Sequence, residues 1–237
     1  MTNSIFIGIL LATALAFASC KKIKGEGPSV TETRTITGFT GISADIDGDV
    51  YVTPDTVFKV EIRAQQNILD IIQSPVVNNE LRLQYKRDVI VGTHDRIAVY
   101  ISAPVVSSLS VSGSSKLLVQ RPVNASYVQL WISGSGFMNI PAINTQSLTC
   151  NISGSGSATV NGGKADDQST EISGSGNTDM LGMQSKRANV HISGSGTARI
   201  NVTETLNADI SGSGNVYYTG TPQVNTRISG SGRVIHL

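Results

Sequence analysis

Six side chains recur at one step of an internal repeat, and three of them, Glu171, His191 and Asp209, could perform acid–base chemistry. Each of the six stands immediately before the isoleucine of an Ile-Ser-Gly-Ser-Gly motif, and together they are Trp131, Asn151, Glu171, His191, Asp209 and Arg227. If the repeats stack in register, neighbours in this column lie about 4.8 Å apart, and the two acids alternate with His191 and Arg227. A column of this kind could line the cleft of a hydrolase or lyase that acts on polysaccharide.

The same column also allows readings without catalysis. Opposite charges on neighbouring strands pair with one another and set the register between strands. The column could also bind a ligand, with Trp131, the only tryptophan, as its aromatic member. A catalytic carboxylate pair must face one bond, whereas His191 separates Glu171 from Asp209 and places them about 9–10 Å apart. We therefore expect a non-catalytic surface and keep the polysaccharide-active enzyme as the alternative.

Two other groups of oxygen-bearing side chains have candidate chemistry. Asp45, Asp47 and Asp49 stand at alternate positions, which predicts one side of a strand, and calcium prefers clustered oxygen ligands. Their sequence lacks the distal glutamate of a full calcium loop, so a solvated strand face is the main interpretation and a metal site the alternative. The motif serines have glycines directly beside them, unlike the serine of a nucleophile elbow, and serve as corner residues. We expect no cofactor.

The elements that would position these residues follow from the repeat itself. Residues two and four positions before the motif isoleucine, and two and four after the motif, are mostly apolar and alternate with polar residues, as in strands with one buried face. The two glycines allow positive φ or close backbone approach. Each repeat therefore reads as strand, glycine corner, strand and return loop. The full copies are 132–136, 152–156, 172–176, 192–196, 210–214 and 228–232, with an imperfect copy at 111–115.

Repeats of this length cannot each bury an apolar face alone, so they must stack. The sequence therefore predicts an all-β fold, a parallel β-helix-like solenoid with coils of 18–21 residues over residues 107–237. Residues 30–106 are β-rich but irregular, with one short helix expected within Gln65–Gln73. The segment starting at Ala44 echoes the one starting at Ala208, which aligns Ile46 with Ile210 and predicts a degenerate coil. We therefore expect one domain over residues 30–237.

The start of the chain has the character of a targeting segment. Residues 5–17 are apolar, too few to span a bilayer, and lead to Ala18-Ser19-Cys20. This predicts a lipoprotein signal peptide over residues 1–19, acylation of Cys20, and a polar tether over residues 20–29. Acyl chains on Cys20 would hold the protein on a membrane. An ordinary signal peptide with an incidental cysteine is the alternative.

Composition excludes some classes of partner. The formal net charge is +1 and only 15% of residues are charged, which disfavours nucleic-acid binding. Apart from Cys20, the only cysteine is Cys150, which lies in an apolar column and is expected to be a buried, unreactive thiol.

The lipoprotein-like start, the Phe39-Thr40-Gly41-Ile42 segment, the expected helix near Ile68 and the ladder of Ile-Ser-Gly-Ser-Gly motifs resemble one family. This is the auto-transporter adhesin, head GIN domain family of Bacteroidota, and the resemblance covers about residues 30–232. It implies a right-handed β-helix-like fold on a secreted or envelope protein, and no catalytic residues. The expected function is therefore that of a lipid-anchored cell-envelope protein, an outer-membrane lipoprotein with a binding or structural surface toward a glycan or another envelope protein.

Overall fold

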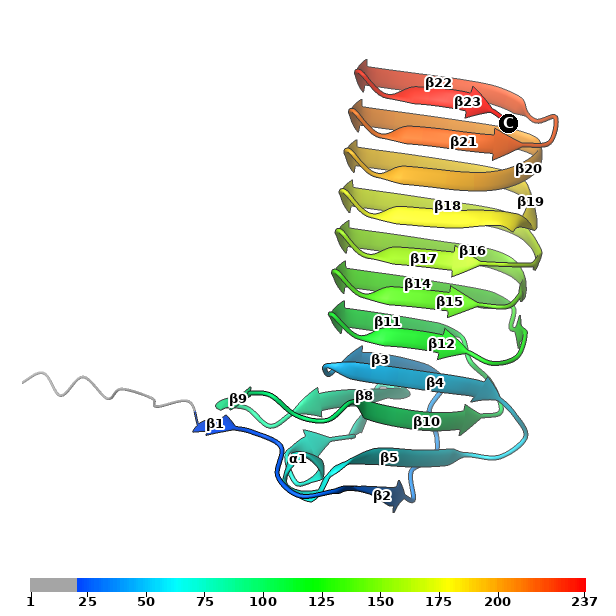
Figure 1. The fold of residues 1–237 in the computed structure, drawn as a ribbon. Coiled ribbons are helices and arrows are strands. Elements are labelled where there is room, and N and C mark those ends of the chain that lie inside the picture. The colour runs from blue at the N-terminus through cyan, green and yellow to red at the C-terminus, as the bar shows by residue number, and fades with distance from the viewer. Residues whose placement is uncertain (1–20) are drawn as a thin grey trace, which may run out of the picture.

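The computed structural model describes the backbone of residues 21–237 and the side chains of residues 22–237. The described chain is nearly all β-structure (Figure 1). The chain forms a β-solenoid of about six turns, which confirms the predicted fold class. Within the described residues, no helix is long and apolar enough to cross a membrane. The predicted signal peptide and Cys20 lie outside the described residues.

Each regular coil contributes one long and one short strand, joined at the glycine corner. The long strands include β11 (Ser108–Gly113), β14 (Tyr127–Gly134), β16 (Ile143–Gly154), β18 (Gly163–Gly174), β19 (Asn177–Gly194), β20 (Thr197–Gly212) and β22 (Gln223–Gly230). The shorter strands after the corners are β12 (Lys116–Val119), β15 (Phe137–Ile140), β17 (Ser157–Val160), β21 (Asn215–Thr219) and β23 (Arg233–His236). Strand β13 (Val123–Asn124) lies in a return segment and pairs with the start of β16. In β19 and β20 the short strand of one coil continues into the long strand of the next.

The coils stack in parallel with the motifs in register. Ile132 pairs with Ile152, Ile152 with Ile172, and the same pairing continues to Ile228. These isoleucines are at most 2% exposed, except Ile228 in the last coil, which is 42% exposed. The period-2 prediction for the inward columns is therefore confirmed, because alternate residues fill the interior along the whole stack.

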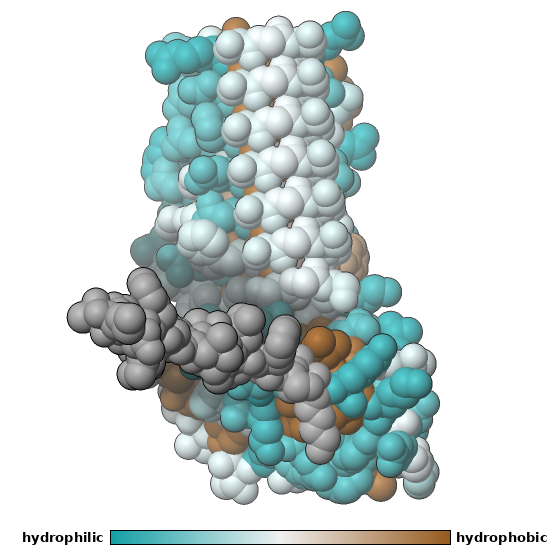
Figure 2. Space-filling view, turned by 90° about the vertical axis from the view of Figure 1, so that its left-hand side faces the viewer, coloured by the Kyte–Doolittle hydropathy of each residue, from teal (hydrophilic) through white to brown (hydrophobic). Residues whose placement is uncertain are grey.

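The two motif glycines have different roles at the corner. The first glycine of each full copy has φ between +103° and +130°, a region that side-chain-bearing residues rarely adopt. The second glycine lies against the isoleucine of the coil below. A Cβ added to Gly196 would be 2.5 Å from Cγ2 of Ile172, so only glycine fits. Small residues form straight columns along this edge of the solenoid (Figure 2).

The imperfect copy shows how this packing can change. Ser115 occupies the position of the second glycine, and the residue of the coil below is Ala44, since Val111 pairs with Ala44. Ala44 has no γ-methyl group, so it leaves room for the Ser115 side chain. The Ser115 hydroxyl donates to the Ile46 carbonyl and accepts from the Ile46 N–H at 3.3 Å.

The change from 20- to 18-residue coils occurs at the return turn. The register between β19 and β20 shifts between Met180 and Gln184 and again between Ser185 and Arg187. From Arg187 onward the long strands pair without interruption up to the corner. The shortening therefore leaves the outward columns of the long strands aligned.

The degenerate first coil is confirmed, with a different register from the one predicted. Strands β3 (Gly41–Asp45) and β4 (Gly48–Pro54) pair in parallel with β11 and β12 above them. Ala44, not Ile46, lies in the column of the motif isoleucines, so the predicted alignment of Ile46 with Ile210 was wrong by two residues. Residues two positions apart on a strand face the same side, so a shift by two residues leaves the alternation of buried and exposed positions unchanged. The sequence pattern therefore did not reveal the shift.

Below this coil lies a cap of irregular strands. Strands β8 (Glu80–Tyr85) and β10 (Ile97–Ala103) continue the parallel stack under β3 and β4. Strand β5 (Lys59–Gln65) then pairs antiparallel with β10, and β2 (Ser29–Arg34) antiparallel with β5. The expected helix is present but is shorter than predicted, α1 (Gln66–Leu69). Strands β6 (Ile72–Gln73) and β7 (Val76–Val77) add antiparallel pairs to β8.

The predicted polar tether is not a free spacer over its described part. Strand β1 (Lys21–Ile23) pairs in parallel with β9 (Val89–Val91). The Gly25 N–H donates to the Thr93 carbonyl at 2.9 Å, and the Glu26 N–H donates to Asn67 Oδ1 at 3.0 Å. Polar, glycine-bearing sequence suggested a solvated linker, but the backbone of this segment is bound to the cap.

Candidate binding face

The outward face of the long strands, here called the long-strand face, carries the column predicted from the sequence. Successive pairing along the stack joins all six side chains in register, and we call them the charge column: Trp131, Asn151, Glu171, His191, Asp209 and Arg227. All six are at least partly exposed to solvent. The structure therefore places the predicted candidates on one open surface.

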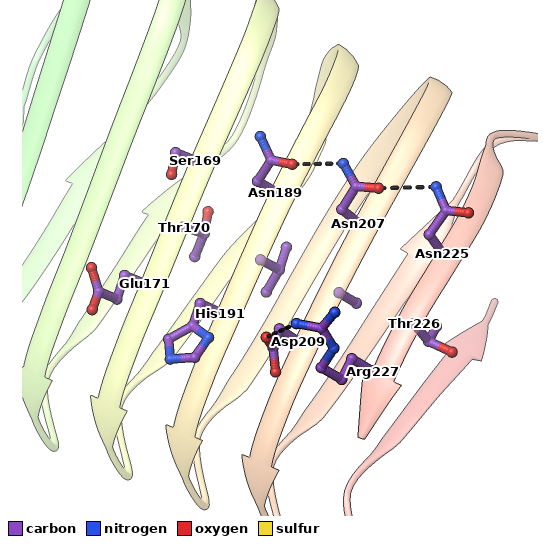
Figure 3. A pocket seen from close by; sticks show the side chains of 12 residues that line it. Ser169, Thr170, Glu171, Asn189, His191, Asn207, Asp209, Asn225, Thr226 and Arg227 are labelled. Carbon is purple, nitrogen blue, oxygen red and sulfur yellow. Dashed lines mark hydrogen bonds and ion pairs between the residues drawn. The ribbon is translucent and has the colours of Figure 1, made fainter. Parts of the chain in front are cut away.

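The upper part of the charge column borders a shallow groove. In Figure 3, the His191 ring lies between Glu171 and Asp209, each on its own coil. The Asp209 carboxylate faces Arg227, with Oδ2 at 3.8 Å from Nη1, and the Arg227 side chain is 86% exposed. Among the described residues, the Glu171 carboxylate has no ion-pair partner. The predicted register pairing thus holds for Asp209 and Arg227.

A ladder of amides runs beside the charge column. Asn207 Nδ2 donates to Asn189 Oδ1 at 2.8 Å, and Asn225 Nδ2 donates to Asn207 Oδ1 at 3.0 Å (Figure 3). We call these three residues the amide ladder. Each amide has a second N–H and a second lone pair beyond the ladder bonds, so the row can still bind hydroxyl groups. These asparagines stand two positions before the charge column at one step of the repeat, and this regular spacing is the signal that could have found them.

Aromatic side chains stand at the lower end of the long-strand face. Trp131 is 48% exposed and Tyr127, four positions earlier on β14, is 57% exposed. Residues at even spacing on a strand share a face, so the two rings project on the same side. Tyr127 was missed from the sequence because it does not stand next to a motif. Its position in the same strand and parity as Trp131 is the signal that could have found it.

The three aspartates do not form the strand face that was predicted. The chain turns between Asp45 at the end of β3 and Gly48 at the start of β4, so Asp45 and Asp47 are exposed at the corner. Asp49 is only 4% exposed and forms an ion pair with Arg96. Within residues 21–237, no three His, Cys, Asp or Glu side chains are grouped so that they could hold a metal ion.

Cys150 occupies the interior. Its side chain is fully buried, and burial raises the pKa of the thiol to about 12. At neutral pH the thiolate population is therefore very small, as expected for a thiol that acts as a small apolar side chain.

A family described as "Putative auto-transporter adhesin, head GIN domain" matches residues 38–222, which is most of the chain. This chain belongs to the head GIN domain family. The match starts just before Phe39 and spans the first coil and the glycine corners, so the resemblance seen in the sequence is confirmed.

Solved structures share the head GIN fold at low sequence identity. A putative adhesin from Bacteroides fragilis has a TM-score of 0.84 at 22% identity and covers 91% of this chain and 100% of its own. A putative adhesin from Parabacteroides distasonis has a TM-score of 0.76 at 22% identity, with coverage of 92% and 100%. A putative lipid binding protein from the same organism has a TM-score of 0.79 at 21% identity, with coverage of 92% and 100%. No match was found among curated proteins.

Proposed function

We propose that this head GIN domain protein is a cell-envelope protein, anchored through acylated Cys20, that binds a glycan on its long-strand face without catalysis. The observation that carries the binding part is the amide ladder beside the charge column, with exposed aromatic rings three coils lower on the same face. The family description as adhesin supports a binding role at the envelope.

The chemistry of the long-strand face fits a polyhydroxylated ligand. Amide groups both donate and accept hydrogen bonds, as sugar hydroxyls require. Tyr127 and Trp131 supply apolar ring faces on which a sugar ring can pack. Because the ladder follows the solenoid axis, it suits a linear chain that runs across several coils.

Binding to an array of purified envelope and plant polysaccharides tests this proposal. We expect Asn207→Ala to weaken binding roughly tenfold, because it removes one hydrogen-bonding group and interrupts both ladder bonds, at about 1–1.5 kcal/mol. Trp131→Ala should weaken binding by a similar factor. Thr159→Ala, on the short-strand side, is the matched control and should bind as the wild type does. Equal binding by all four proteins would contradict a ligand site on the long-strand face.

An enzyme that acts on polysaccharide is the second candidate, because Glu171, His191 and Asp209 border the same groove. Glu171→Gln distinguishes the two. If the long-strand face only binds, neither the wild type nor Glu171→Gln cleaves any of the polysaccharides. Cleavage by the wild type that is lost in folded Glu171→Gln protein would establish catalysis instead.

The anchor has a separate test. Cys20→Ser removes the acylation site, so the protein should move from the membrane fraction to the soluble fraction of the cell envelope. Ser19→Ala, which leaves the cysteine in place, should remain with the membrane. A Cys20→Ser protein that stays in the membrane fraction to the same extent would contradict the anchor.

A further inference from the structure

We propose that the two-stranded ribbon of β1 and β9 is a membrane-contacting surface that binds anionic lipid headgroups and inserts the Ile90 side chain among them. This inference rests on the proposed acylation of Cys20 for its location, but its own chemistry lies in described residues. The ligand class is an anionic phospholipid bilayer surface.

The ribbon begins directly after the proposed anchor residue. Lys21 is the first residue of β1, and it pairs with Val89. Cys20 precedes Lys21 directly, and consecutive Cα atoms are about 3.8 Å apart. Acyl chains on Cys20 would therefore hold the bilayer surface directly beside the ribbon, with no spacer between the anchor and the ribbon. The cap, and not the regular coils, must then lie nearest the bilayer.

The two faces of the ribbon differ in composition. Ile23, Val89 and Val91 pack against the hydrophobic core of the cap. The pairing places Lys22 beside Ile90 on the opposite, outward face, where Ile90 is 52% exposed. An aliphatic side chain flanked by lysines on a surface beside a lipid anchor matches the interface of a bilayer, where apolar groups enter and charges remain at the headgroups.

The lysines of β1 and its continuation lie together on the outward side of the ribbon. A Cβ added to Gly92 would lie 3.1 Å from Cγ of Lys24 and 3.3 Å from Cε of Lys22, so both aliphatic stems lie over Gly92. The side chains of Lys86 and Arg87, just before β9, are also exposed. None of these four cations forms an ion pair with another described residue, whereas many other basic side chains of the domain do. They are therefore available for headgroup phosphates.

Nearby carboxylates limit the attraction. Glu26, Asp88 and Asp95 are the acids of the two segments, and Asp95 already accepts a hydrogen bond from Ser29. Asp45 and Asp47 border the same groove as Arg87. The side of the molecule on which the described chain begins also shows apolar surface on the cap between hydrophilic residues (Figure 2). The ribbon thus combines an exposed apolar side chain with unpaired positive charge where an anchor would hold it.

The test uses the chain from residue 20 with Cys20→Ser, so that no acyl group contributes. Its partition is measured on vesicles of phosphatidylcholine and on vesicles of equal parts phosphatidylcholine and phosphatidylglycerol. We expect salt-sensitive binding to the mixed vesicles only. Lys22→Gln with Lys24→Gln should lower the partition about 30-fold, since each lysine near an anionic surface is worth about 1 kcal/mol.

A matched control removes the same two charges elsewhere. Lys164 and Lys186 lie together at the return turns of the regular coils, and Lys164→Gln with Lys186→Gln should change the partition less than about threefold. An equal loss in both double variants, or equal binding to both kinds of vesicle, would overturn the proposal. These outcomes are independent of whether Cys20 is acylated in the cell, which the fractionation of Cys20→Ser decides.

The position of Ile90 has its own readout. An environment-sensitive fluorophore attached to Ile90→Cys in the same protein should shift its emission to shorter wavelength on mixed vesicles. Labelling is selective because Cys150 is buried. The control is Val57→Cys, since Val57 is 59% exposed in the connection of β4 to β5, on the opposite side of the cap (Figure 1). A shift of similar size at Val57 would contradict insertion of the ribbon.

Discussion

The cap and the regular coils bury their interiors with different side chains. The cap encloses large residues such as Phe39, Leu69 and Leu81, whereas the upper coils combine the motif isoleucines with alanines such as Ala188 and Ala198. A regular coil has hydrogen-bonded neighbours above and below, so some of its inward side chains can be small. The cap ends the stack, and it closes that end with antiparallel strands and larger apolar side chains. Repetition can therefore replace side-chain volume as a source of stability.

The strongest test of this comparison places a charge inside a regular coil. Ile172→Asp should lower the free energy of unfolding by at least about 4–5 kcal/mol, because the carboxylate has no partner in the interior. Circular dichroism during urea unfolding measures the change. Ser173→Asp, at the adjacent exposed position, should alter stability little. A folded Ile172→Asp protein of normal stability would show that the coils do not depend on their apolar interior.

The next largest loss in the free energy of unfolding is expected from a cavity in the cap. The Phe39 ring is 1% exposed and lies with its centroid 5.0 Å from that of Phe58. Phe39→Ala should cost about 3–5 kcal/mol, by the same unfolding measurement. The half-buried Phe137 of the regular coils is the matched control, and Phe137→Ala should cost clearly less. Equal costs would remove the distinction between a cap that depends on large side chains and coils that do not.

Packing at the glycine corner can be tested by compensation. Gly136→Ala should cost about 1–3 kcal/mol, because its Cβ would overlap Cγ1 of Val111 in the coil below. Val111→Ala removes that methyl group, so the double variant should lose about 1 kcal/mol less than the sum of the single variants. The natural pair of Ser115 over Ala44 is the precedent. Strict additivity would contradict the proposed contact.

A small gain in stability is expected inside the upper coils. The Thr178 hydroxyl is buried and has no hydrogen-bond partner among the described residues. Thr178→Val should therefore raise the free energy of unfolding by about 1 kcal/mol. Thr170→Val is the control, because the Thr170 hydroxyl accepts from Gln168 Nε2 at 3.2 Å and its removal should destabilise. The opposite order of the two effects would contradict this account of the interior.

The smallest effect concerns a charge pair on the surface of the coils. The Arg187 guanidinium donates to Asp167 at 2.6 Å and lowers the pKa of that carboxyl below its ordinary value. A lowered pKa gives stability that is present above the unfolded value and is lost as pH falls through the folded value. A nuclear magnetic resonance titration should show this pKa, and Arg187→Gln should return it toward the ordinary value. An unchanged pKa in Arg187→Gln would contradict the pairing.

The regular coils could be predicted from the sequence, and the cap could not. Inward columns, glycine corners and the position of the charge column all follow from a pattern that repeats at fixed spacing. Strand β5 pairs with both β2 and β10, partners far away in the chain, and no periodic signal announces such contacts. The pairing of β1 with β9 was missed for the same reason.

The candidate site was predicted only where it follows the repeat. The six members of the charge column were found because they stand next to a motif. Asp45, Asp47 and Asp49 were expected on one side of a strand, but the chain turns between Asp45 and Gly48, and a corner breaks that alternation. The side chain of Asp49 is held by Arg96, a contact between separate strands that its own neighbours in sequence do not indicate.

Corners that carry both glycines are interchangeable between coils. The second glycine of one coil meets the same isoleucine methyl group in the coil below from Gly156 to Gly232. A duplication or loss of one whole repeat within this range would create only junctions of a kind already present. The junction of Ser115 with Ala44 fits nowhere else in the stack. The gene can therefore lengthen or shorten the rod by whole units above the first coil, while the end that carries the cap keeps a fixed design.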